Sequence, residues 1–200
     1  ILAHLCGAVA VSNYEKDICY NAVKELTDRG MKQVNIHQLL SQETFEKAKE
    51  LVEDFYTDDR LKNLNAIVFL SLKQKGRGET YHRLEDSEFE DFVIYCLDKG
   101  VRFGFDSCTA TKFTNVINKY PQYDKLLTFV EPCESCLFSS YINVLGDFYP
   151  CSFAEGVAPL KGINVPECDN FLTDVWFSDR SNLWREMLLE NKRACPIYNV

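Results

Sequence analysis

Short β-forming runs alternate with amphipathic helical stretches over the first half of the chain, and no other feature of the sequence constrains the fold as strongly. The β-forming runs cover 8–11, 33–36, 66–70 and 101–105, and apolar residues recur at helical spacing between them. Strands that alternate with helices pair in parallel through right-handed crossovers. The sequence therefore predicts an α/β fold, either an open sheet or part of a β/α barrel.

The expected helices cover 15–28, 43–56, 87–100, 109–120 and 181–190. The third of them opens with Ser87-x-x-Glu90, which predicts a capping box, and it closes at Gly100. These signals indicate well-defined helix ends.

Composition excludes several classes of function. The net charge is −8 with no basic stripe, so the chain is not expected to bind nucleic acid in general. The longest apolar runs, 5–11 and 66–72, are shorter than the roughly 20 residues of a membrane-spanning helix. The first residues lack an initiator Met, a basic flank and a cleavage site, so they indicate a cut inside a longer protein rather than a signal peptide.

The chain has nine cysteines and no export signal, which predicts a cytoplasmic protein whose grouped thiols bind metal or do redox chemistry. From residue 132 the sequence becomes rich in Cys, and then in Gly and Pro over 155–166. A module of about 70 residues that is this rich in loops is too small to be stable through a hydrophobic core alone, so it needs a metal site or another cross-link. We therefore expect two domains, 1–131 and 132–200.

The cysteine spacing of the second domain predicts a sulfur site. Cys133 and Cys136 form a C-x-x-C pair, and a hairpin turning at Gly146-Asp147 would bring Cys151 back beside them. Three thiolates make three corners of a tetrahedral site for a metal or an iron–sulfur cluster.

The fourth ligand comes from Cys195, which we favour because the last helix can carry it back to the hairpin, or from Cys168. Spacing alone leaves zinc and iron–sulfur equally open, since four thiolates suit both. The remaining thiols are expected to fill core space or surface positions without a metal. They are Cys6, Cys19, Cys96 and Cys108.

The spacing Cys136-x9-Gly146-x4-Cys151 resembles the signature that opens the SPASM or twitch extension of radical SAM enzymes. The run 143–153 is similar to the hairpin of that family, and the segment 172–176 together with Arg185 and Cys195-Pro196 resembles its ending. Upstream, 9–12, 33–37 and 68–77 resemble late strands of the radical SAM partial barrel. The resemblance thus covers nearly the whole chain.

The resemblance implies late strands of a partial (β/α)6 barrel followed by a small Cys-rich α+β module of twitch or SPASM type. It further implies that Cys133, Cys136, Cys151 and Cys195 hold one auxiliary 4Fe-4S cluster. The full-length protein would then use S-adenosylmethionine and a reductant such as flavodoxin or ferredoxin to modify a peptide or a small molecule.

One departure from the family is that the Cys-x3-Cys-x2-Cys motif of the SAM-cleaving cluster does not occur in these 200 residues. The chain by itself is therefore not expected to generate a 5′-deoxyadenosyl radical, and no catalytic residue is assigned.

In β/α barrels the reactive groups lie at the carboxyl ends of the strands. Polar residues expected at those ends are Ser12, Asn35, His37 and Lys73, and Asn35 and His37 share one face because they are two apart. The resemblance implies that these side chains contact S-adenosylmethionine or substrate. A hydrogen-bonded structural histidine and a basic surface loop are the alternatives for His37 and Lys73.

Two other functions remain open. The first is a non-catalytic interaction module stapled by zinc. The second is a cluster-free β/α metabolic enzyme in which His37, Asp106 and Lys73 act as acid and base.

Overall fold

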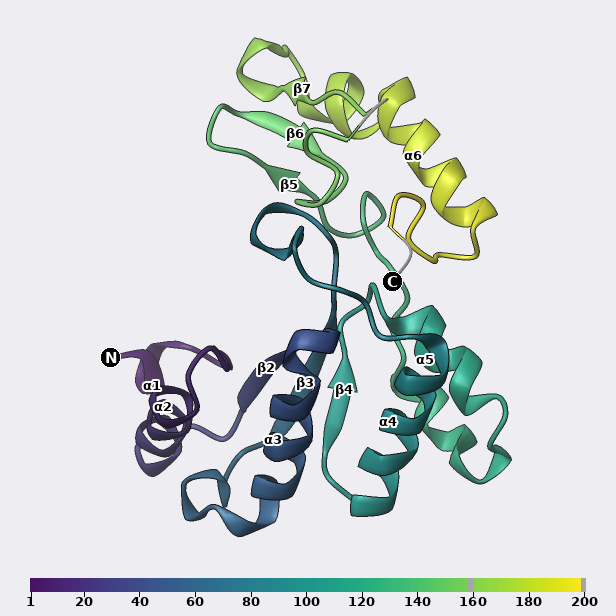
Figure 1. Ribbon diagram of the computed structural model, residues 1–200. Coiled ribbons are helices and arrows are strands. Elements are labelled where there is room, and N and C mark those ends of the chain that lie inside the picture. Colours follow the sequence, from purple (N-terminus) through teal and green to yellow (C-terminus); the bar gives the residue numbers. More distant parts are fainter. Residues whose placement is uncertain (158–159, 199–200) are drawn as a thin grey trace. The chain divides into compact units, whose positions relative to one another are not determined.

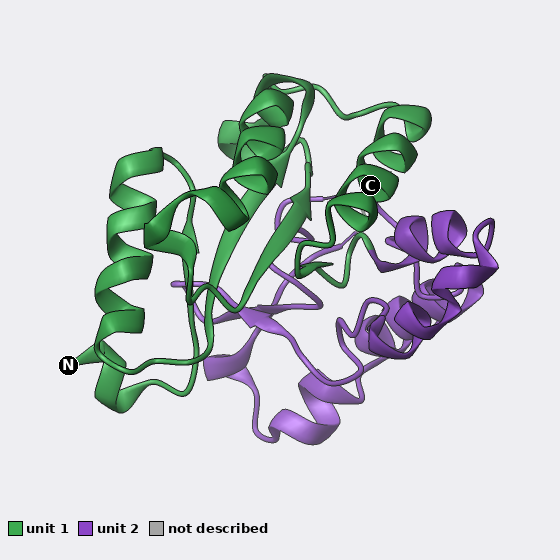
Figure 2. Cartoon of the chain, turned by 90° about the horizontal axis from the view of Figure 1, so that it is seen from below, with its two compact units in different colours: residues 1–109 green, residues 110–200 purple. Residues whose placement is uncertain are grey.

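The computed structural model of the chain describes residues 1–157 and 160–198. It divides into two compact units, residues 1–109 and residues 110–200, which Figure 2 distinguishes by colour. The first unit is an α/β structure with a parallel sheet, and the second contains a small antiparallel sheet. The predicted domain boundary at 131/132 separates the expected barrel part from the expected Cys-rich module, and it stays a prediction.

The parallel sheet of the first unit has four strands within the described residues. They are β1 (Val9–Ser12), β2 (Val34–Leu40), β3 (Ala66–Ser71) and β4 (Phe103–Phe105). The helices of this unit are α1 (Leu2–Leu5), α2 (Lys16–Asp28), α3 (Phe45–Thr57) and α4 (Asp86–Lys99), with 3-10 turns over Gln42–Thr44, Asp59–Leu61 and Gly76–Gly78.

The strands are ordered β1-β2-β3-β4, so each one pairs with its neighbour in the sequence. When every right-handed crossover leads to the next strand on the same side, successive helices lie on the same face of the sheet. Figure 1 shows α3 and α4 running alongside β2, β3 and β4. Because the order of the described strands never reverses, this part of the sheet has no switch point of the kind that doubly wound folds use for ligands.

The core of the first unit lies between the helices and one face of the sheet. Alternate residues of β2 and β3, such as Ile36, Ile67 and Phe69, are fully buried. The Phe69 ring meets Phe92 of α4 edge to face, with centroids 4.9 Å apart. Cys96, also on α4, is buried in the same way, which agrees with its expected packing role.

Helix α4 starts with a capping box, but not the predicted one. The Glu85 carboxylate caps the first turn, and the Glu88 carboxylate accepts from the Glu85 amide at 2.8 Å. Ser87 lies inside the helix, because a glutamate pair two residues earlier satisfies the first free N–H groups. The predicted closing residue is right, since Gly100 has a φ of 66° and ends the helix.

Strand β2 continues to Leu40, four residues beyond its predicted end at 36. The polar pair His37-Gln38 suggested an end, but Gln38 occupies a core-facing position and Leu40 is buried next to it. Asn35 and His37 consequently lie inside the strand and not at its carboxyl end, which corrects that part of the site prediction.

The second unit is built from short elements. Its strands are β5 (Tyr141–Ile142), β6 (Asp147–Tyr149) and β7 (Ile163–Asn164), ordered β5-β6-β7 and antiparallel. Its helices are α5 (Ala110–Ile117), α6 (Asp179–Glu190), 3-10 segments over Pro121–Phe129 and Val165–Glu167, and a π-helix over Phe171–Trp176. Neither β7 nor the π-helix is among the elements predicted from the sequence.

The predicted hairpin forms, with its turn over residues 143–146, slightly before the predicted position. The Asn143 side chain accepts from the amides of Leu145 and Asp147 at 2.9 Å, so it closes the turn. Gly146 has a φ of 85°, and a Cβ there would lie 2.8 Å from the Pro166 ring. Both conditions require glycine.

The core of the second unit gathers around Cys136, Phe148, Val175 and Trp184, all buried. Helix α6 contributes Trp184 and starts two residues before its predicted position, because Ser178 caps it. Within the two described ranges, no helix has the length and apolar character needed to cross a membrane.

Candidate metal centre

The C-x-x-C pair lies on a loop that folds on itself before β5. The Leu137 amide donates to the Glu134 carbonyl at 2.9 Å, and the Cys136 amide donates to the Ser139 carbonyl at 2.7 Å. Cys136 adopts a φ of 57°, in the left-handed region. Local hydrogen bonds thus fix the backbone from which both thiols, Cys133 and Cys136, extend.

Cys151 follows β6 by two residues and is the thiol with the most informative surroundings. Burial raises its pKa, and hydrogen bonds from the backbone of Phe153 and Ala154 act in the opposite direction. The pKa rises further because Cys195 and Cys133 interact electrostatically with it. The structure therefore brings Cys133, Cys151 and Cys195 into one neighbourhood.

The segment after α6 is tied to the C-x-x-C loop by Arg193. Its guanidinium donates to the Cys133 carbonyl at 2.9 Å and to the Pro132 carbonyl at 2.7 Å. Further along, the Tyr198 amide donates to the Cys195 sulfur at 3.3 Å. These contacts hold Cys195 beside the loop although some 60 residues separate the bonded groups.

Cys136 differs from the other three predicted ligands. Its thiol reaches the Ser181 carbonyl at 3.9 Å and packs in the apolar core with Trp184. Burial raises its pKa, and the nearby Arg185 guanidinium opposes that change. Arg185 also donates to the Cys136 carbonyl at 2.7 Å, so it secures the backbone of this residue.

The alternative fourth ligand, Cys168, lies in different surroundings. Its thiol donates to the Asn164 carbonyl at 3.3 Å, and its side chain packs against the apolar core of the second unit. The thiols that raise the pKa of Cys151 electrostatically are those of Cys195 and Cys133.

The donor chemistry of this neighbourhood fits a thiolate-bound metal or cluster. Bound thiolates are stabilised by N–H donors and nearby cations, and both Cys151 and Cys195 accept backbone hydrogen bonds. The Nη2 of Arg185 is buried without a hydrogen-bond partner among the described residues, which leaves a donor beside Cys136. However, no three or more His, Cys, Asp or Glu side chains within 1–157 and 160–198 are already arranged to hold an ion.

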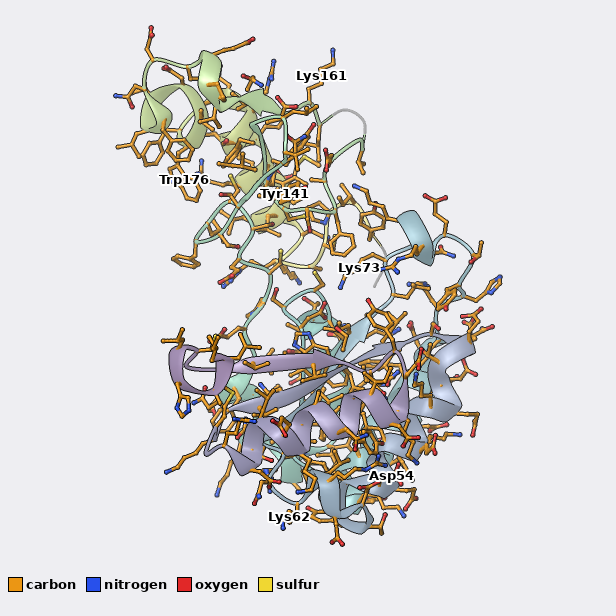
Figure 3. The ribbon with its side chains drawn as sticks, turned by 90° about the vertical axis from the view of Figure 1, so that its left-hand side faces the viewer. Asp54, Lys62, Lys73, Tyr141, Lys161 and Trp176 are labelled. Carbon is orange, nitrogen blue, oxygen red and sulfur yellow. The ribbon has the colours of Figure 1, made fainter. Side chains whose placement is uncertain are left out.

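A second group of polar residues includes Asn13, Lys73 and Asp106, which follow β1, β3 and β4, and Gln38, which lies inside β2. Asn13, 8% exposed, donates to the amide oxygen of Gln38, 1% exposed, at 2.8 Å. Lys73, 8% exposed, forms an ion pair with Asp106, and Thr109 donates to the same carboxylate. Figure 3 shows Lys73 at the opposite end of this unit from Lys62.

The sequence predicts Ser12 and His37 as site residues, whereas the buried polar contact is made by their neighbours Asn13 and Gln38. The sequence does contain a signal for Gln38. It is a polar residue at a position of β2 that faces the core, because it lies on the same face of the strand as Ile36 and Leu40. The Asn13 carboxamide oxygen is buried with no donor among the described residues.

Ser12 and His37 face the same side of the sheet and pair in register. Asn35 shares that face near the start of β2, where its side chain accepts from Asn65 at 2.9 Å. Of the residues proposed for acid–base chemistry, Lys73 and Asp106 form an ion pair, and His37 lies in β2.

No protein-family model matches the chain, and neither the curated proteins nor the solved structures contain a match.

Proposed function

We propose that Cys133, Cys136, Cys151 and Cys195 hold an auxiliary 4Fe-4S cluster, and that the chain is part of a radical SAM enzyme. The observation that carries this proposal is the grouping of Cys133, Cys151 and Cys195, with backbone N–H donors directed at two of the sulfurs. The resemblance of the cysteine spacing supplies the enzyme class.

In this proposal each residue has a distinct task. Phe153 and Ala154 stabilise the Cys151 thiolate through their amides, and Tyr198 does the same for Cys195. Arg185 and Arg193 fix the C-x-x-C backbone through its carbonyls. A bound cluster would supply electron transfer or an open iron for substrate, with a potential set by burial and hydrogen bonds to sulfur.

The first unit would contribute late strands of a partial (β/α)6 barrel. The sequential strand order supports this, because singly wound sheets of this kind close into barrels whereas doubly wound sheets reverse. Asn13 and Lys73 follow the carboxyl ends of β1 and β3, where barrels place reactive groups. We propose these two residues, with the hydrogen-bonded Gln38, for contact with S-adenosylmethionine or with a peptide or small-molecule substrate in the full-length protein.

The test is anaerobic reconstitution of the chain with iron and sulfide, followed by iron, sulfide and zinc analysis and Mössbauer spectroscopy. About four irons per chain are expected, lost in Cys151→Ala and Cys195→Ala and kept in the matched control Cys168→Ala. The Cys136→Ala variant decides whether this core-packed thiol is the fourth ligand.

The zinc-stapled interaction module is the second candidate, since the same thiolates suit zinc. Stoichiometric zinc in the isolated chain, with no stable iron uptake, would overturn the cluster proposal in its favour. Unchanged metal content in every cysteine variant would overturn both and leave the cluster-free β/α enzyme.

A further inference from the structure

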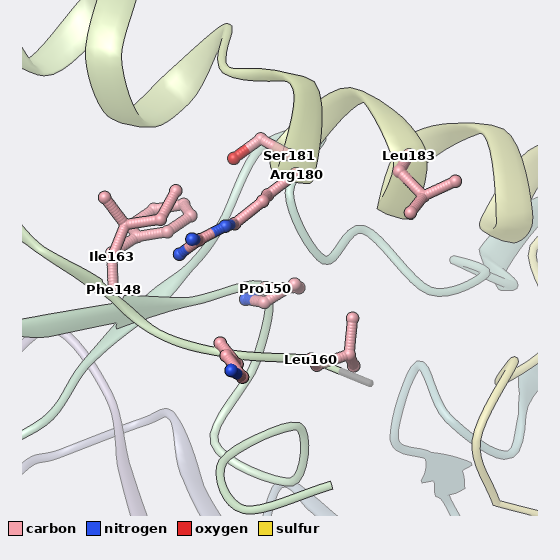
Figure 4. A pocket seen from close by; sticks show the side chains of 8 residues that line it. Phe148, Pro150, Leu160, Ile163, Arg180, Ser181 and Leu183 are labelled. Carbon is pink, nitrogen blue, oxygen red and sulfur yellow. The ribbon is translucent and has the colours of Figure 1, made fainter. Parts of the chain in front are cut away.

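The second unit contains a cavity of about 140 Å³ whose described lining includes none of the three grouped thiols. Figure 4 shows its lining, which comes from the end of β6, the segment around β7 and the first turns of α6. The apolar part of the lining consists of Phe148, Pro150, Leu160, Ile163 and Leu183. A space of this size holds one aromatic ring or one branched aliphatic group.

The polar part of the lining is cationic. Arg180 and Lys161 line the cavity, and no carboxylate appears among the described residues of the lining. Ser181 is the other polar residue, but its hydroxyl already donates to the Val175 carbonyl at 2.6 Å. The polar groups that this lining offers a ligand are therefore the cationic donors of Arg180 and Lys161, since the Ser181 hydroxyl proton is already used.

Arg180 is held in place by the fold. It donates through Nη1 to the Gly162 carbonyl at 3.0 Å, which uses one of the five N–H donors of a guanidinium. Gly162 is itself pressed against β6, because a Cβ there would lie 2.8 Å from the Tyr149 ring. Arg180 also belongs to the first turn of α6, whose macrodipole favours a negative charge.

We propose that this cavity binds an organic carboxylate that carries one aromatic or branched aliphatic group. The apolar wall takes the group, and Arg180 with Lys161 takes the carboxylate, because a guanidinium matches that planar anion. The site does not depend on the metal proposal, since none of the predicted ligand cysteines lines it.

The experiment titrates the ¹⁵N-labelled 200-residue chain with 3-phenylpropionate and follows backbone amide shifts, beside the uncharged 3-phenylpropanol. Saturable shifts confined to the lining residues are expected, with binding at least about tenfold weaker for the alcohol. Equal binding of acid and alcohol, or shifts spread over the chain, would overturn the proposal.

Two variants test the lining itself. Arg180→Gln removes the fixed cation, and Leu183→Glu places a carboxylate at a wall residue that is 50% exposed, so neither disturbs the core. Each should weaken 3-phenylpropionate about tenfold or more. Lys125→Gln, an exposed cation outside the lining, is the matched control and should leave binding unchanged. Equal binding by all three variants would refute the assignment.

A last arm separates two sources of the ligand. N-acetyl-Gly-Gly-Phe carries the same phenyl and carboxylate groups at the end of a peptide. Binding of both compounds points to a peptide terminus as the occupant, and binding of the free acid alone points to a small metabolite. Either result supports the carboxylate site, and failure of both compounds refutes it.

Discussion

The hydroxyl of Ser135 links the core of the second unit to the proposed metal site. Trp184, 1% exposed, donates from Nε1 to the Ser135 oxygen at 3.0 Å, and the Cys133 sulfur lies 3.1 Å from the same oxygen. The change Ser135→Ala removes this acceptor with little change of volume. A buried donor left without a partner costs about 1–3 kcal/mol, so the free energy of unfolding should fall by about 2 kcal/mol.

The assay is urea unfolding at constant pH, followed by tryptophan fluorescence. It reports on residues 110–200 because both tryptophans of the chain, Trp176 and Trp184, lie there. The exposed Ser140→Ala is the matched control and should change the free energy of unfolding by less than about 0.5 kcal/mol.

A double-mutant cycle completes the measurement. Trp184→Phe removes the donor along with part of the indole packing, so it destabilises the unit by itself. Once the donor is gone, Ser135→Ala leaves nothing unsatisfied on the ring, and the double variant should lose about 1–2 kcal/mol less than the sum of the single variants. Additive losses, or a Ser135→Ala variant as stable as Ser140→Ala, would refute the reasoning.

Three other changes should have measurable effects on stability. Lys73→Ala leaves the partly buried Asp106 carboxylate without its cation and should cost the first unit about 2–3 kcal/mol in urea unfolding followed by circular dichroism; a loss below about 0.5 kcal/mol would contradict the ion pair. Gly146→Ala should lower the melting temperature more than Gly156→Ala, because both glycines have a positive φ but only the first meets a proline ring; equal losses would exclude the clash. Burial raises the pKa of the Cys96 thiol above its ordinary value of 9.0, so this thiol stays protonated in the folded chain at a pH where it ionises in the unfolded chain. Its contribution to the free energy of unfolding is therefore fully present below pH 9 and falls above it by about 1.4 kcal/mol per pH unit. Cys96→Ala should flatten the alkaline limb of a stability profile, and an unchanged limb would contradict the assignment.

The α/β character of the first unit could be predicted because its β-forming runs and its helical stretches differ clearly in the spacing of apolar residues. A continuous apolar run marks β3, and apolar residues at helical spacing followed by Gly100 mark α4. The length of β2 could not be predicted, since Gln38 appears polar in the sequence yet is satisfied in the core by Asn13. Only a cross-strand partner makes that position tolerable.

In the second unit the hairpin could be predicted from its turn residues, whereas the surroundings of the thiols could not. Only two residues separate Cys133 from Cys136, yet Cys133 approaches Cys151 whereas Cys136 enters the core beside Trp184. The left-handed backbone of Cys136 and the position of α6 decide this. Neither feature can be predicted from the spacing of the cysteines.

The Arg193 contacts also have a consequence for the order of folding. In the first unit each strand pairs with the next strand in the sequence, so its contacts can form as the chain emerges from the ribosome. The C-x-x-C loop instead forms its contact with Arg193 only after that residue, 60 positions downstream of Cys133, has been synthesised. Closing so long a loop is slow and costs chain entropy. The thiols of Cys133 and Cys136 are therefore synthesised well before the residues that enclose them, and this interval is when oxidation or a wrong metal would reach them most easily.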